Sequence, residues 1–130
     1  MNKLNSILLI DDNKIDNFFH ERVIKKYDAA IRVTAKTSGE QALDYLLNAT
    51  IDELPDLIFL DINMPGMNGW EFLQEYHKMG TERKKSMIIV MLSTSEDPED
   101  KAMALTQGIA ADYKSKPLTQ QMLEEIMQKH

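Results

Sequence analysis

Three short apolar runs, residues 7–10, 57–60 and 87–92, each end at polar side chains. Uninterrupted apolar runs of this length are typical of strands that are buried on both faces of a sheet. Residues 31–36 instead alternate between apolar and polar, and residues 112–115 are partly polar. Both of these patterns indicate strands near the edges of a sheet. The hydrophobic pattern therefore predicts five strands.

Apolar residues recur at helical spacing in the segments that follow these strands. In the first helix we expect an apolar stripe made of Ile15, Phe18, Phe19, Val23, Ile24 and Tyr27. The later helix starts are marked by Ser38 with Gln41, Asn68 with Glu71, Asp97 with Pro98, and Thr119. The sequence thus predicts five helices, one after each strand.

Strands that alternate with helices are typical of βαβ units, in which helices cover both faces of a parallel sheet. We therefore predict an α/β fold with a doubly wound, five-stranded parallel sheet. The 130 residues contain no linker, internal repeat or low-complexity tract. We expect a single domain over residues 1–130, with its core at about residues 6–128.

Composition excludes several classes of function. The net charge of −6, with no basic run, argues against direct nucleic-acid binding. The absence of cysteine excludes disulfides and thiol catalysis, and it suits a reducing compartment. The first apolar run is too short for a signal peptide or a membrane span. We expect a soluble cytoplasmic protein that does not associate with membranes.

The carboxyl ends of the predicted strands carry the candidate chemistry. In a parallel sheet these ends meet at one edge, which gathers Asp11, Asp12, Asp61, Ser93 and Lys116. Three close carboxylates repel one another unless a cation neutralises them, and Mg²⁺ prefers such oxygen ligands. A lysine and a hydroxyl beside them suit a phosphoryl group. Without cysteine or a well-placed histidine, a carboxylate nucleophile that forms an aspartyl phosphate is the natural candidate.

Four motifs, in this order and at these spacings, carry a family resemblance. They are LLIDDNK, LDINMPGMNG, VMLSTSEDPED and YKSKPLT. From about Ser6 to Gln128, the sequence resembles the receiver domain of bacterial two-component response regulators, of the chemotaxis-protein (CheY-like) type. The resemblance implies a flavodoxin-like sheet of strand order 2-1-3-4-5 with helices on both faces. It also implies that the Lys116–Pro117 bond is cis.

The resemblance assigns a role to each acid at the strand ends. Asp61 would accept the phosphoryl group, and Lys116 would pair with it. A Mg²⁺ ion would be held by Asp11, Asp12, Asp61 and the backbone carbonyl of Asn63. The domain would catalyse only its own phosphorylation and dephosphorylation, and would not be a metabolic enzyme.

The same resemblance implies a switch. The hydroxyl of Ser93 would move onto the phosphoryl group, and the ring of Tyr113 would follow. One residue more than the commonest spacing lies between Gly108 and Tyr113, so the switch position falls on either Ser93 or Thr94. We prefer Ser93, because a loop after a helix absorbs an extra residue easily.

The implied partners are proteins. A sensor histidine kinase or a phosphotransfer protein would donate the phosphoryl group to a stand-alone receiver. A downstream effector would bind the surface of the fourth helix, fifth strand and fifth helix, where Lys101, Lys114 and Gln121 are candidate contacts. The three histidines, His20, His77 and His130, show no paired spacing, and we expect them on helix surfaces.

Three other functions are compatible with parts of the pattern. A Mg²⁺-dependent phosphatase of the haloacid-dehalogenase type also forms an aspartyl phosphate, but it needs an acid where this chain has Asn63. A flavodoxin would need a hydroxyl- and glycine-rich loop where Asp11 and Asp12 stand. A receiver-like scaffold that is never phosphorylated would have lost an acid, and none is lost here.

Overall fold

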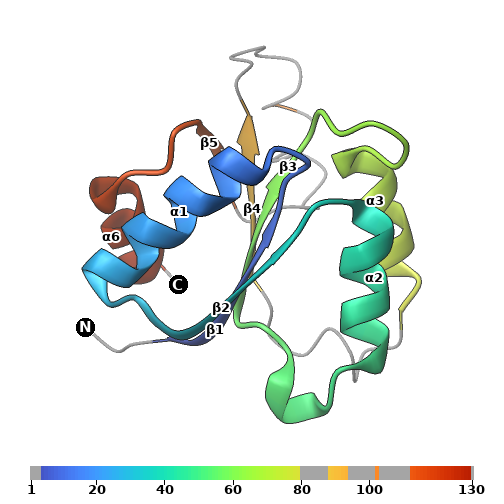
Figure 1. The fold of residues 1–130 in the computed structure, drawn as a ribbon, viewed down its shortest axis with the longest axis horizontal. Coiled ribbons are helices and arrows are strands. Elements are labelled where there is room, and N and C mark those ends of the chain that lie inside the picture. The colour runs from blue at the N-terminus through green and yellow to red at the C-terminus, as the bar shows by residue number, and fades with distance from the viewer. Residues whose placement is uncertain (1–3, 80–87, 94–101, 103–111, 130) are drawn as a thin grey trace.

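The computed structural model describes residues 4–79, 88–93, 102 and 112–129, and Figure 1 shows how their helices and strands are arranged. In chain order the elements are β1 (Leu4–Ile10), α1 (Lys14–Tyr27), β2 (Ala30–Lys36), α2 (Gly39–Asn48), a 3₁₀ turn (Ile51–Glu53), β3 (Leu57–Asp61), α3 (Gly69–His77), β4 (Ile88–Ser93), β5 (Asp112–Ser115) and α6 (Gln120–Lys129). Of the expected fourth helix, which would begin near Asp97, only Ala102 is among the described residues, and it is helical and exposed. Among the helices that are described, none has the length and apolarity needed to cross a bilayer.

The five strands are all parallel, and their order is β2-β1-β3-β4-β5. The predicted α/β fold and strand order are therefore confirmed. Residues 57–61 of β3 are all buried, as expected for a strand at the centre of the sheet. The edge strand β2 is partly exposed, as predicted for a strand near the sheet edge, but its exposure does not follow the alternation of its sequence, since Ile31 is 71% exposed.

Helices cover both faces of the sheet (Figure 1). On one face, Ala42 and Leu46 of α2 and Phe72 of α3 pack in one core cluster with the side chains of β1 and β3 that point that way. On the other face, Ile24 of α1 and Leu123 of α6 belong to a second cluster. The sheet is thus the middle layer of three, and its strand ends are free to form a site at one edge.

Three of the predicted helix caps are confirmed by hydrogen bonds. The Ser38 side chain accepts from the Gln41 amide at 3.1 Å. At the start of α3, Asn68 and Glu71 cap each other's backbone amides in a complete capping box. The Thr119 hydroxyl accepts from the amide of Met122 at 3.2 Å. These three helices therefore begin where their polar caps predict.

The predicted apolar stripe of α1 is wrong in its first half. Ile15, Phe18 and Phe19 are 65%, 57% and 52% exposed. The buried positions there are Asn17 and His20, so the expectation that His20 lies on the surface is also wrong. The physical reason is that this part of α1 packs against the acids at the strand ends. Asn17 and His20 line a small hollow there together with Asp11 and Asp61.

Candidate functional site

The carboxyl ends of the strands bring the predicted acids together. Asp11 follows β1, and Asp61 is the last residue of β3. Their carboxylates and that of Asp12 each place an oxygen within 4.8 Å of the other two. Asp11 and Asp61 are only 3% and 6% exposed, whereas Asp12 is exposed. The cluster therefore has two buried acids and one that faces solvent.

The turn between β1 and α1 fixes the position of Asp11. The Asp11 amide donates to the carbonyl of Lys36 at 3.1 Å, which ties it to the end of β2. Its carboxylate accepts from the amide of Asn13 at 2.9 Å. Asn13 in turn caps α1, accepting from the amides of Ile15 and Asp16. The same turn thus begins the helix and orients the Asp11 carboxylate.

Lys116 lies among the acids. Its ammonium nitrogen is 2.6 Å from Asp11 Oδ2, 3.0 Å from Asp16 Oδ2 and 3.6 Å from Asp61 Oδ1. Burial acts to lower the pKa of Lys116, but its hydrogen bonds to Asp11 and Asp16, together with the charges of Asp11 and Asp61, outweigh burial and raise that pKa. Lys116 is therefore a firmly charged cation that partly neutralises the cluster. The peptide bond from Lys116 to Pro117 is cis, as the resemblance implied.

Asp61 has an unusual charge equilibrium. Its burial, and next the charge of Asp11, raise the pKa of Asp61 from 3.8 to about 6. Lys116 and a hydrogen bond from the Asn63 backbone act in the opposite direction. A carboxyl with this pKa is mostly ionised at neutral pH, yet it gains from any added positive charge. Strongly perturbed acids of this kind are common at functional sites.

Three polar residues of α1 also belong to the site, and the sequence interpretation did not include them. Asp16 pairs with Lys116, as described above. The Asn17 side-chain amide donates to the carbonyls of Asp11 at 2.9 Å and Lys36 at 3.4 Å. Burial lowers the pKa of His20, which is 3% exposed. The available signal was the spacing from the cap: positions three and four residues after Asn13 lie beside the strand ends.

Of the two predicted switch residues, Ser93 lies near this cluster along the sheet, whereas Tyr113 lies two residues before the end of β5. Asp61 pairs in register with Leu92, so Ser93 stands one residue further along β4, beside Ser115 of β5. Tyr113 is 6% exposed and belongs to the core cluster that covers the α2–α3 face. The other candidate hydroxyl, Thr94, lies outside the described residues.

The predicted effector surface is described only in part. Lys114 forms ion pairs with Glu125 of α6 at 3.0 Å and with Asp112 at 3.7 Å. Gln121 is exposed on the same helix. Lys101 lies outside the described residues, and of the expected fourth helix only Ala102 is described.

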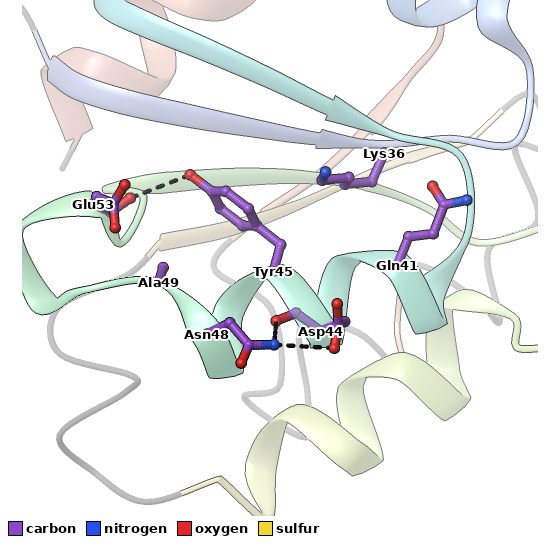
Figure 2. A pocket seen from close by; sticks show the side chains of 7 residues that line it. All are labelled: Lys36, Gln41, Asp44, Tyr45, Asn48, Ala49 and Glu53. Atoms are coloured by element: carbon purple, nitrogen blue, oxygen red, sulfur yellow. Dashed lines mark hydrogen bonds between the residues drawn. The ribbon is translucent and has the colours of Figure 1, made fainter.

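A second hollow lies away from the acids, between α2, the end of β2 and the 3₁₀ turn (Figure 2). The Tyr45 hydroxyl there donates to the carbonyl of Glu53 at 3.4 Å, and the Lys36 ammonium lies 5.3 Å from the centre of the Tyr45 ring. The Asn48 amide donates to the carbonyl and carboxylate of Asp44. These polar groups are engaged with one another, in contrast to the crowded acids at the strand ends.

Comparison with known proteins agrees with this geometry. Residues 7–128 match the family model for the response regulator receiver domain. A two-component response regulator from Cytophaga hutchinsonii is 37% identical, with a TM-score of 0.88 over 98% of this chain and 97% of that one. The chemotaxis protein CheY4 of Vibrio cholerae is 26% identical, with a TM-score of 0.77 over 97% and 98% of the two chains.

A curated relative is longer than this chain. The nitrate/nitrite response regulator protein NarL of Escherichia coli (strain K12) is 38% identical over 103 residues, which are 79% of this chain and 44% of NarL. This chain thus spans less than half of that relative. The family match, by contrast, covers nearly all of the described sheet and helices. With its acid cluster at the strand ends, this chain belongs to the response regulator receiver domain family of two-component systems.

Proposed function

We propose that the protein is a phosphorylatable switch in which Asp61 accepts a phosphoryl group. The observation that carries the proposal is the position of the Asp61 carboxylate. It is buried at the end of β3, within 4.8 Å of two further acids and 3.6 Å from the Lys116 ammonium. A carboxylate in such a place is a nucleophile with charge stabilisation already beside it.

The transfer is a displacement at phosphorus. An ionised Asp61 oxygen forms the new P–O bond while the P–N bond of a donor phosphohistidine breaks, and the leaving imidazole is neutral once it carries a proton. With a pKa of about 6, Asp61 is mostly ionised at neutral pH and therefore available to attack. Lys116 provides N–H donors for the phosphoryl oxygens, whose negative charge grows during the transfer.

The donor set fits Mg²⁺. Asp11, Asp12 and Asp61 offer hard oxygen ligands, and the single lysine among them leaves net negative charge to be neutralised. We infer that these carboxylates and the backbone carbonyl of Asn63 would hold the ion. When bound, Mg²⁺ supplies positive charge to the phosphoryl oxygens. The low exposure of Asp11 and Asp61 keeps bulk water from screening that charge.

We infer that phosphorylation shifts an existing equilibrium of the domain. The Ser93 hydroxyl would donate to a phosphoryl oxygen, and Tyr113, two strand positions before Ser115, would respond along β5. The donor would be a sensor histidine kinase or a phosphotransfer protein. The effector would read the surface near β5 and α6, where Lys114 and Gln121 lie.

A haloacid-dehalogenase type of phosphatase would use the same aspartyl phosphate but release phosphate repeatedly. It would need an acid two residues after the nucleophile, where this chain has Asn63. The membership of the receiver family also favours a switch, because receiver domains are signalling switches and not metabolic enzymes.

Phosphoramidate, which donates through a P–N bond as phosphohistidine does, tests the proposal. With magnesium present, we expect one phosphoryl group per chain, which hydroxylamine removes because it attacks acyl phosphates. A phosphatase would instead turn over many equivalents of an aryl phosphate without accumulating on the chain. A hydroxylamine-resistant product would place the phosphoryl group on a hydroxyl and contradict the proposal.

A further inference from the structure

We propose that Asp16 is a positioning residue that holds Lys116 in the resting site and releases it when Asp61 carries a phosphoryl group. The inference rests on the proposed function, since it assigns a second partner to the lysine of that site. The contacts of Lys116 support an exchange of Asp16 for the phosphoryl group as its partner.

The Lys116 ammonium is drawn toward α1 in the resting structure. It lies 2.6 Å from Asp11 and 3.0 Å from Asp16, both within hydrogen-bond distance. The distance to Asp61 is 3.6 Å, which is too long for a hydrogen bond. Lys116 is therefore bonded to the two acids at the β1–α1 turn and only near the nucleophile.

The local structure of α1 accounts for the place of Asp16. Asn13 caps the helix and accepts from the Asp16 amide at 3.2 Å, which sets Asp16 in the first turn. An acid in this turn is favoured by the helix dipole wherever its side chain points. The dipole does not require a contact with a lysine 100 residues away in the sequence, yet that contact is formed at 3.0 Å.

The exposure of the two partners makes the ion pair easy to exchange. The Lys116 side chain is 9% exposed, whereas the Asp16 side chain is 33% exposed. Asp16 can therefore be hydrated after it loses its partner, while the buried Lys116 has to stay beside anions, as Asp11 and a phosphoryl group would be. A phosphoryl group on Asp61 carries up to two negative charges close to the ammonium, where the ionised carboxylate carries one. Lys116 would move onto it, and Asp16 would turn to solvent.

The first test measures the affinity for beryllium trifluoride, a phosphoryl analogue, in saturating magnesium. Asp16→Asn removes a resting-state partner that competes with the analogue for Lys116, so we expect binding about three- to tenfold tighter than in wild type. Glu21→Gln is the matched control, because Glu21 is on the same helix, has the same 33% side-chain exposure and pairs with Lys25 instead. Unchanged or weaker binding by Asp16→Asn, or equal tightening by Glu21→Gln, would overturn the proposal.

The second test follows the Lys116 ammonium itself by ¹⁵N-resolved NMR. In the free proteins, the Lys116 signals of wild type and Asp16→Asn should differ, because only wild type has the Asp16 contact. At saturation with the analogue the two signals should coincide, because Asp16 has then released Lys116. Equal signals in the free proteins, or different signals at saturation, would overturn the exchange.

These outcomes separate the two proposals. If wild type fails to bind the analogue in magnesium, the proposed function is wrong and the exchange falls with it. If wild type binds and the Lys116 signals do not converge, the exchange alone is wrong. Asp16→Glu serves as the conservative variant: it keeps the charge, and we expect its analogue affinity to lie closer to wild type than that of Asp16→Asn.

Discussion

Asp61 combines two properties that are in conflict in the metal-free protein. It is buried beside other acids, and it has to be ionised in order to react. Burial and the charge of Asp11 raise its pKa to about 6. The ionised Asp61 carboxylate therefore destabilises the fold at neutral pH. A cation, or magnesium bound with a phosphoryl group, would relieve this repulsion.

This conflict predicts how stability depends on pH. Because the folded pKa of Asp61 exceeds the unfolded value of 3.8, the folded protein binds the proton more tightly between about pH 4 and pH 6. Its contribution to stability is present below that window and is lost as the pH rises through it. In a chelator, Asp61→Asn should be about 1–3 kcal/mol more stable than wild type at pH 7.

Urea denaturation at several pH values measures this difference. The advantage of Asp61→Asn should shrink toward about pH 4, where wild-type Asp61 is protonated in the folded state. A variant less stable than wild type at pH 7 without metal would show that the acids are not in conflict.

Lys116 has the opposite role, since it neutralises Asp11 and Asp61 in the absence of metal. Lys116→Ala would leave these buried acids without their cation and should destabilise the metal-free protein by about 2–4 kcal/mol. Magnesium should bind at least as well as in wild type and restore part of the loss, while binding of a phosphoryl analogue should fail. Denaturation with and without magnesium checks this, and a loss of magnesium affinity would mean that Lys116 holds the ligands in place.

At the scale of the elements, α3 is packed directly against the end of the phosphoacceptor strand. Gly69, the first residue of α3, donates its amide to the Ile62 carbonyl at 2.9 Å. A Cβ added at Gly69 would lie 2.8 Å from the Asp61 carbonyl oxygen and 2.8 Å from Ile62 Cα. These neighbours are backbone atoms, which cannot move without shifting the site.

Gly69→Ala should therefore destabilise the protein by about 1–3 kcal/mol, although alanine is favourable in helices. Gly39→Ala is the matched control, because Gly39 is the first residue of α2 and its added Cβ would meet the Met67 sulfur at 2.7 Å. A methionine end can turn away, so we expect a smaller loss there. If the two variants lowered the denaturant midpoint equally, the close approach of Gly69 to the backbone of Asp61 and Ile62 would be contradicted.

Helix α1 shows where sequence reasoning worked and where it did not. Helical spacing predicted that a helix runs from about Ile15 to Tyr27, and the structure has it at Lys14–Tyr27, whereas its cap at Asn13 was not predicted. Which face is buried depends on the neighbours, and the first half of α1 packs its polar side toward the acid site. Asn17 and His20 are buried there because they complete that site. The spacing of Asn17 from the helix cap was a local signal for its place, whereas no local pattern in the sequence pointed to His20.

The exposed side of α1 gives a direct test of this arrangement. Phe19 is 52% exposed and Ile24 is fully buried. Phe19→Gln should change the free energy of unfolding by less than about 0.5 kcal/mol, as is usual for surface positions. Ile24→Ala should cost about 2–4 kcal/mol. If thermal or urea denaturation gave similar losses for both variants, Phe19 would belong to the core after all.

At the scale of the whole molecule, the strand order makes the site. Residues from β1, β3 and the end of β5 are distant in sequence, and the parallel sheet places their carboxyl ends at one edge. This part of the site was predictable, because the buried runs, their polar ends and the parallel topology all follow from the hydrophobic pattern. The contact of Asp16 with Lys116 was not, because it depends on side-chain directions across 100 residues of chain.

Intact-protein mass spectrometry shows whether Asp61 is the phosphoacceptor of this site. Wild type and Asp61→Asn would be incubated with acetyl phosphate, each with magnesium and with a chelator. We expect one added phosphoryl group on wild type in magnesium and none in the other three samples. A phosphoryl group on Asp61→Asn, or a folded wild type that binds magnesium and gains no mass, would contradict it.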